Sequence, residues 1–125
     1  MLRTGSVFVI PTLRQRPANP GQVIALPAAH VTALHRAEPG LLADLFGVVA
    51  RLTEAAPAAF GAAGTTMFGN TDAPGQELPH VHVHVVPRFP GDGFAVPDPA
   101  AQPAPHAQRA ELAARLRQAL AERKN

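Results

Sequence analysis

Cysteine is absent from this 125-residue chain, which excludes disulfide bonds and thiolate metal sites. Tryptophan and tyrosine are also absent, and no apolar run approaches the roughly 18 residues needed to span a membrane. The opening MLRTGSVFVIPT has a short apolar run and no small-residue cleavage site, so we expect no signal peptide. We therefore expect a soluble, cytoplasmic protein without a membrane partner.

Clustered positive charge is lacking too. The formal net charge is only +2, and the computed pI of about 10.4 is high because every basic residue except Lys124 is an arginine. The basic residues are scattered apart from Arg14, Arg16 and the C-terminal segment, so no stripe of the kind that nucleic-acid binding requires is present. This distribution predicts no nucleic-acid partner and is compatible with a small anionic ligand.

Four short segments have the composition of β-strands. Residues 5–12 and 22–27 are rich in β-branched and apolar side chains, and the Pro, Asn and Gly of 13–21 are typical of a connecting turn. We predict that the first two strands form a hairpin. Residues 65–70 and 80–88 are the third and fourth predicted strands.

Two helices are expected. From Pro39 the apolar residues recur at helical spacing, and we predict that Pro57 stops this helix at about Ala56. A second amphipathic helix is predicted over 106–122, after a segment, 90–105, with too much proline and glycine for regular structure.

The order of strands and helices predicts a single α+β domain with an antiparallel sheet covered on one face. We place the core in residues 1–94, followed by a proline-rich linker over 95–105. The C-terminal helix, within 106–125, is expected to lie on or beside that core.

The most informative stretch is GQELPHVHVHVVPR, residues 75–88, in which His80, His82 and His84 alternate with valines. Alternation with period two is typical of a β-strand, so the valines would face a core and the histidines the opposite face. Neighbouring histidines would then lie roughly 7 Å apart. One small ion or phosphate can comfortably touch two of them, but not three.

Two chemistries fit such a row. A pair of these histidines could bind zinc if a third ligand, such as His30 or Asp92, arrived from elsewhere. Alternatively, one neutral imidazole attacks phosphorus while its neighbour assists the leaving group. The preceding NTDAPGQE, residues 70–77, supplies amides, a flexible glycine and backbone N–H groups for phosphate oxygens.

The stretch closely resembles the signature of the histidine triad (HIT) family, which is His-φ-His-φ-His-φ-φ with φ apolar, preceded by Gly-Gln. The similarity extends to NPGQVIALPAAHV (19–31) and PRFPGDGF (87–94), and covers roughly residues 6–94. The resemblance implies a HIT-like antiparallel sheet with two main helices and a homodimer. It also implies hydrolysis or transfer at the α-phosphate of a nucleotide, through a nucleotidyl-histidine intermediate. We expect no obligatory metal and no other cofactor.

Family roles transfer to matching positions of this sequence. The resemblance implies that His82 is the nucleophile, that His84 contacts the phosphate and leaving group, and that His80 supports the array. The positions that match phosphate-binding residues are Gln76, the backbone of Glu77, and Asn70.

Two positions depart from the family pattern. Gln22 stands where the family often has a histidine; it can hydrogen-bond the triad, at His80 or His82, but cannot shuttle protons. Arg14 stands where many members have an Asp or Asn that binds ribose hydroxyls. Since arginine has no acceptor, it favours an additional phosphate or carboxylate instead.

These observations lead to one main hypothesis and one alternative. The main hypothesis is a nucleotide hydrolase or nucleotidyltransferase whose substrate is a phosphoramidate, a dinucleoside polyphosphate or a related nucleotide. The alternative is a HIT-fold nucleotide-binding protein with little turnover.

Overall fold

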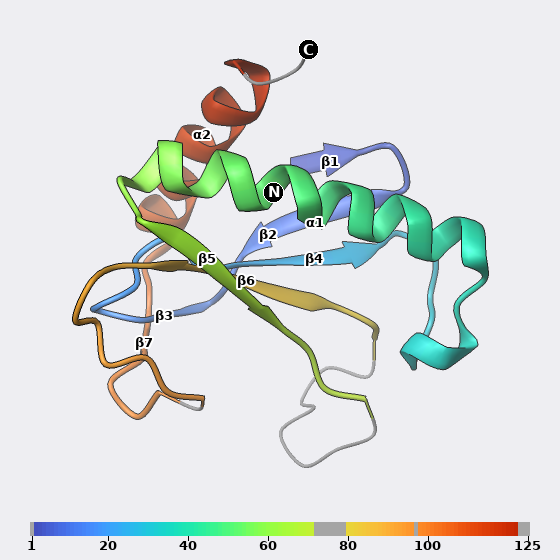
Figure 1. The fold of residues 1–125 in the computed structure, drawn as a ribbon, viewed down its shortest axis with the longest axis horizontal. Coiled ribbons are helices and arrows are strands. Elements are labelled where there is room, and N and C mark those ends of the chain that lie inside the picture. The colour runs from blue at the N-terminus through green and yellow to red at the C-terminus, as the bar shows by residue number, and fades with distance from the viewer. Residues whose placement is uncertain (1, 72–79, 97, 123–125) are drawn as a thin grey trace.

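The computed structural model describes residues 2–71, 80–96 and 98–122, and its centre is a five-stranded antiparallel sheet (Figure 1). Across the sheet the strands are β1 (Leu2–Thr4), β2 (Val7–Pro11), β4 (Val23–Pro27), β6 (Val83–Arg88) and β5 (Gly64–Phe68). The second and third of these form the predicted hairpin pairing, and β6 lies in the interior of the sheet between β4 and β5. This α+β architecture confirms the predicted fold class.

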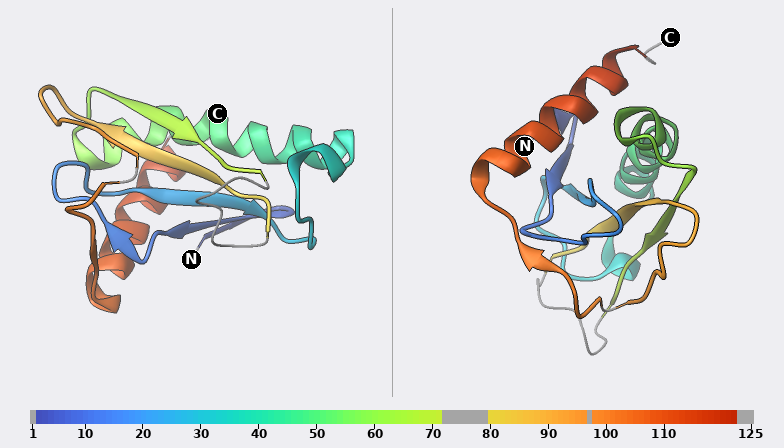
Figure 2. Two further views of the ribbon diagram at one scale, coloured as in Figure 1. Left: turned by 90° about the horizontal axis from the view of Figure 1, so that it is seen from below. Right: turned by 90° about the vertical axis from the view of Figure 1, so that its left-hand side faces the viewer.

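Two helices, α1 (Pro39–Phe60) and α2 (His106–Glu122), pack against each other and on one side of the sheet (Figures 1 and 2). Their apolar faces join alternate residues of the central strands in a single core. From α2 this core takes Leu112, Leu116 and Ala119. Alternation along a strand sends its other side chains to the opposite, helix-free face.

Helix α1 is longer than predicted. It continues through Pro57 to Phe60 and ends at Gly61, which adopts the left-handed conformation with φ of 70°. Proline removes one backbone donor and crowds the preceding turn, but a single further turn is kept because Ala56 and Phe60 are buried in the core. The predicted stop at Ala56 was therefore wrong.

The predicted strand over 80–88 begins later than expected, at Val83, so His80 and His82 precede β6. The proline-rich region also contains regular structure, since Gln102–Pro103 forms β7 and pairs with β3 (Arg14–Gln15). The expected turn over 13–21 and the expected linker over 95–105 are thus joined by a short two-stranded ribbon. Such pairing between segments far apart in sequence has no signature in local composition.

Two further elements were not predicted, namely β1 at the sheet edge and the short 3-10 helix η1 (Leu34–Arg36). In the described part of the chain, no helix has the length and apolar character needed to cross a bilayer.

Candidate functional site

The three histidines of the triad share one side of the chain as it enters β6. Val81, Val83 and Val85 are buried in the core, whereas His80, His82 and His84 are only partly buried. The alternation thus begins before the strand itself. The ring centroids of His82 and His84 are 5.0 Å apart, closer than strand spacing alone predicts, with an interplanar angle of 70°.

His80 is anchored to the neighbouring strand. Its Nε2 lies 2.9 Å from the backbone carbonyl oxygen of Pro27, and because a carbonyl only accepts, Nε2 carries the proton. The His30 ring meets the His80 ring edge-on at 5.5 Å. His80 therefore ties the start of the triad to the end of β4.

His82 has a defined tautomer when neutral. Its Nδ1 lies 2.7 Å from the carbonyl oxygen of His80, so Nδ1 donates and the lone pair is on Nε2. His82 also lines a mostly apolar cavity of about 200 Å³ together with Phe68, Asn70 and Phe46. An imidazole with a free Nε2 lone pair at the wall of a cavity has the form required of a nucleophile.

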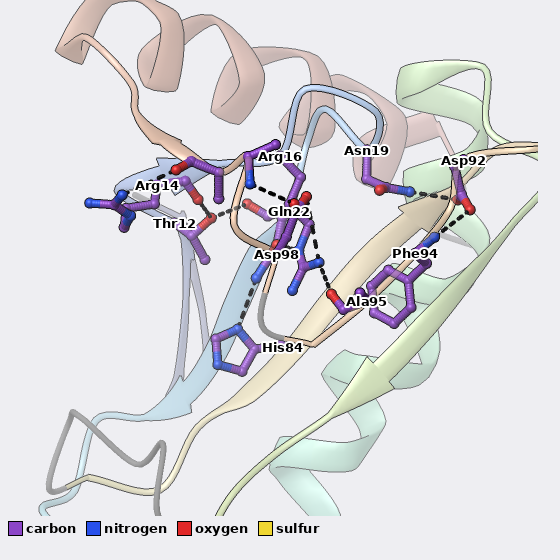
Figure 3. Close-up of polar contacts among 12 residues, drawn as sticks. Thr12, Arg14, Arg16, Asn19, Gln22, His84, Asp92, Phe94, Ala95 and Asp98 are labelled. Carbon is purple, nitrogen blue, oxygen red and sulfur yellow. Dashed lines mark hydrogen bonds and ion pairs between the residues drawn. The ribbon is translucent and has the colours of Figure 1, made fainter.

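His84 is held by the side chain of Gln22, which is held in turn by Arg16. Arg16 Nε donates to Gln22 Oε1 at 2.6 Å, and the Gln22 amide nitrogen lies 3.0 Å from His84 Nδ1 (Figure 3). A guanidinium has no acceptor, so the Gln22 atom facing Arg16 must be the oxygen. The amide nitrogen must then donate to His84 Nδ1, which leaves the imidazole proton on Nε2.

Gln22 therefore contacts the last histidine of the triad, whereas contact with His80 or His82 was expected. The strand register explains this difference. His84 is paired with Ile24 across the β4–β6 ladder, so Gln22, two residues before Ile24, is its diagonal neighbour on the same face.

The charge state of His84 follows from its surroundings. Burial is the largest influence and lowers the pKa of His84 to about 4, with further lowering from the neighbouring His82 and Arg16. Phe68 lies directly opposite His84 in the β5–β6 ladder and covers its ring. His84 is consequently a neutral hydrogen-bond donor at pH 7.

Arg16 is itself buried, with 6% of its surface exposed. Its Nη1 donates to the backbone carbonyl of Ala95 and lies 3.9 Å from a carboxylate oxygen of Asp98, while its guanidinium is 4.8 Å from the centre of the Phe94 ring (Figure 3). These contacts connect the segment after β6 to Gln22, and through it to His84.

Glycine is required immediately before Gln22. Gly21 has a φ of +102°, and a Cβ atom at this position would lie 2.6 Å from the Phe60 ring. The tight approach of this turn to the end of α1 places Gln22 just before β4, beside His84.

Arg14 was expected to contact the substrate, but it lies at the β3–β7 ribbon. Its guanidinium donates to the carbonyl of Ala101 at 3.1 Å, next to the β3–β7 ribbon, and Figure 3 shows it well separated from His84. A role for Arg14 in substrate choice remains a prediction.

Asp92, considered above as a third zinc ligand, is committed to other contacts. Its two oxygens accept from Arg88, Asn19 and the backbone N–H groups of Phe89 and Phe94. These bonds, led by Arg88, hold the pKa of Asp92 well below its usual range. Among the described residues, no three His, Asp or Glu side chains are grouped as a metal site requires.

Of the predicted phosphate-binding residues, Asn70 lies in the wall of the cavity beside His82. Gln76 and Glu77 lie outside the described residues. Sequence reasoning missed Arg16 and Phe68 as neighbours of His84, because neither belongs to a motif. A partial signal existed for Phe68, which precedes Asn70 by two residues on a predicted strand.

Comparison with known proteins shows the family and the fold. The family profile described as HIT domain matches residues 7–91. Bis(5′-nucleosyl)-tetraphosphatase [asymmetrical] from Schizosaccharomyces pombe is 35% identical over 79 residues, which are 62% of this chain. The chain spans only 43% of the length of that relative.

Two solved structures illustrate the shared fold. A HIT-like protein involved in cell-cycle regulation from Bartonella henselae has a TM-score of 0.80 at 24% identity, over 94% of this chain and 83% of that one. A zinc-bound histidine triad family protein from Mycobacterium smegmatis has a TM-score of 0.75 at 24% identity, over 97% and 82%. The family profile covers most of the chain, and this protein belongs to the HIT domain family.

Proposed function

We propose that this protein is a nucleotide hydrolase or nucleotidyltransferase that acts at the α-phosphate through a nucleotidyl intermediate on His82. One observation carries the proposal. The outward nitrogens of adjacent histidines have opposite protonation, with a lone pair on Nε2 of His82 and a proton on Nε2 of His84. The activity named for the Schizosaccharomyces pombe relative supports the same class of reaction.

In the first step, Nε2 of His82 forms a bond to the α-phosphorus. The bond from phosphorus to the leaving group breaks, and its electron pair departs with the leaving group. The Nε2–H of His84, whose ring centre is 5.0 Å from that of His82, donates a hydrogen bond to an oxygen of the reacting phosphate or of the leaving group.

In the second step, an acceptor oxygen attacks the phosphorus from the side that the leaving group vacated. When the acceptor is water, the N–P bond breaks, the electron pair returns to His82 Nε2, and the water proton passes to bulk solvent. A nucleoside monophosphate is released. An alcohol or phosphate acceptor gives transfer instead, by the same bond changes.

The test is a substrate screen with wild type and His82→Ala. Adenosine and guanosine polyphosphates and phosphoramidates are offered in turn, and release of the nucleoside monophosphate is measured by chromatography. We expect wild type to turn over at least one class and His82→Ala to lose activity by a factor on the order of 10⁴ or more. Tight nucleotide binding without turnover in wild type would support the alternative of a binding protein.

We also propose that the protein is a homodimer, as the family resemblance implies. Strand β5 is at an edge of the sheet, and Met67 on that strand and Phe46 on α1 are exposed large apolar residues. Light scattering coupled to size-exclusion chromatography measures the mass directly, and a mass near that of one 13.1 kDa chain would contradict the proposal.

A further inference from the structure

The hydrogen bonds from Arg16 to Gln22 and from Gln22 to His84 affect which leaving groups this site accepts. We infer that Arg16 and Gln22 are positioning residues that lock His84 as a neutral Nε2–H donor, so that the site favours leaving groups that depart as anions, such as nucleoside polyphosphates, over amines. This inference rests on the proposed function and concerns the substrate class of the same site.

The lock follows from a fixed order of donors and acceptors. Arg16 donates to Gln22 Oε1, and the Gln22 amide donates to His84 Nδ1. A proton on Nδ1 would point at an N–H group that cannot accept it. Rotating the Gln22 amide by 180° would relieve that clash only by placing its NH₂ against the guanidinium of Arg16, which is also donor-only.

Burial keeps the lock in place. Gln22 is 5% exposed and Arg16 is 6% exposed, so water cannot readily substitute for either partner. Arg16 is in turn held by the Ala95 carbonyl and by Asp98. Phe68 stacks on the His84 ring at a centroid distance of 4.5 Å and covers one of its faces.

The charged and titratable groups around His84 also favour the neutral form of its ring. His82 lies beside it on the same segment, and Arg16 lies behind Gln22. Both disfavour a positive charge on the ring, as its burial does. Asp98 is the acid paired with Arg16, and it is not among the influences on the pKa of His84. The ring also meets two uncharged side chains, Gln22 just before β4 and Phe68 on β5.

A neutral, locked imidazole has a chemical limit. It can donate a hydrogen bond from Nε2, but it can give up that proton only by becoming an anion, which is inaccessible near pH 7. A polyphosphate leaves as an oxyanion and needs no proton, so a hydrogen bond is sufficient. An alkylamine leaving from a phosphoramidate must receive a proton on nitrogen as the P–N bond breaks, and His84 in this state cannot supply it.

The test compares two substrates, diadenosine tetraphosphate and an adenosine 5′-phosphoramidate of a simple alkylamine. For wild type we expect kcat/KM for the polyphosphate to exceed that for the phosphoramidate by on the order of 10²-fold, which is a typical contribution of a general acid. Long-range ¹H–¹⁵N NMR spectra of the histidine rings should show His84 protonated at Nε2 only, from about pH 5 to pH 8.

The key variant is Gln22→Glu, which preserves size and the partner of Arg16. A carboxylate accepts from Arg16 with one oxygen and from His84 Nδ1–H with the other, so His84 becomes an imidazolium more readily. We expect the NMR titration midpoint of His84 to rise by at least one pH unit. The ratio of kcat/KM values should move towards the phosphoramidate by about tenfold or more.

Two further variants serve as checks. Arg16→Met frees the Gln22 amide to rotate, and both His84 tautomers should then appear in the spectra. Arg51→Met is the matched control, because it makes the same substitution at an exposed arginine of α1 and keeps the Arg16–Gln22 bond. It should leave the His84 tautomer and the substrate ratio unchanged within about twofold.

The outcomes separate the two proposals. Turnover of neither substrate class by wild type overturns the proposed function. Turnover of both classes with equal kcat/KM, a proton on His84 Nδ1 in wild type, or an unmoved ratio in Gln22→Glu overturns the inference about the leaving group.

Discussion

The rings of Phe68 and His84 lie nearly parallel, with centroids 4.5 Å apart and an interplanar angle of 10°. They are directly opposed in the β5–β6 ladder, so the stack is a cross-strand pair on the helix-free face of the sheet. Phe68 also lines the cavity that contains His82. A single aromatic side chain therefore shields one histidine and forms a wall of the space beside the other.

This stack predicts the effect of Phe68→Leu. Leucine keeps an apolar side chain but leaves part of the His84 ring accessible to water, so we expect the pKa of His84 to rise from about 4 towards its ordinary value. An NMR titration of the ring measures this change. Met67→Leu on the same strand is the control, since Met67 is 53% exposed and alternation along β5 directs it to the opposite face from Phe68. An unchanged midpoint in Phe68→Leu would contradict a shielding role.

Covalent trapping tests the assignment of the nucleophile. His84→Ala removes the outward donor but keeps the Nε2 lone pair of His82, which is set by the His80 carbonyl. Both chemical steps should slow by a factor on the order of 10²–10⁴. With a slow nucleotide substrate, mass spectrometry should then find an acid-labile adduct on His82. An adduct on His80, with His82→Ala still active, would reverse the assignment.

Stability should depend on pH through His84. Its pKa is about 4 in the folded protein and near 6.5 when unfolded, so between these values only the unfolded chain binds the proton. The neutral state of folded His84 therefore makes its full contribution to the free energy of unfolding above pH 6.5. This contribution is lost as the pH falls through 4. Its size is on the order of 2 kcal/mol after allowing for solvent screening. Urea unfolding of wild type and His84→Asn over pH 3.5–8 measures it, and parallel pH profiles for the two proteins would refute it.

Activity should not require a metal ion. Asp92 is occupied by five hydrogen-bond donors, and among the described residues no three His, Asp or Glu side chains are grouped as a tetrahedral ion requires. We expect turnover to survive exhaustive chelation. The control is addition of zinc to the chelated enzyme, which should not increase the rate. Loss of turnover on chelation, restored by zinc alone, would favour the metal hypothesis.

Arg14 provides a test of substrate preference outside the triad. If its positive charge attracts a second anionic group, Arg14→Asp should shift the ratio of kcat/KM values several-fold towards simple nucleoside monophosphate esters, and the wild-type preference should weaken with salt. Arg14→Gln separates charge from packing, since it can still donate to the Ala101 carbonyl but carries no charge, and it should shift the ratio in the same direction. An unchanged ratio in Arg14→Asp would assign Arg14 to packing of the β3–β7 ribbon alone.

Local pattern was sufficient for much of the fold. The alternation of valine and histidine before and within β6, the β-branched composition of β2 and β4, and the helical spacing after Pro39 each reflect burial on one face, which is a local property. Prolines were less reliable guides. Pro57 is tolerated inside α1, and Pro103 lies in β7, because tertiary contacts outweigh the local cost at both places.

The sequence by itself identified the triad and its alternation, since both lie within a few consecutive residues. Only the tertiary structure decided what each histidine contacts. Gln22 and His84 are 62 residues apart, and strand register makes them neighbours. The protonation of His84 depends in addition on Arg16, a residue in no motif, because a donor-only guanidinium fixes the direction of the Gln22 amide. Hydrogen-bond direction is a property of three side chains in space, and no spacing along the chain encodes it.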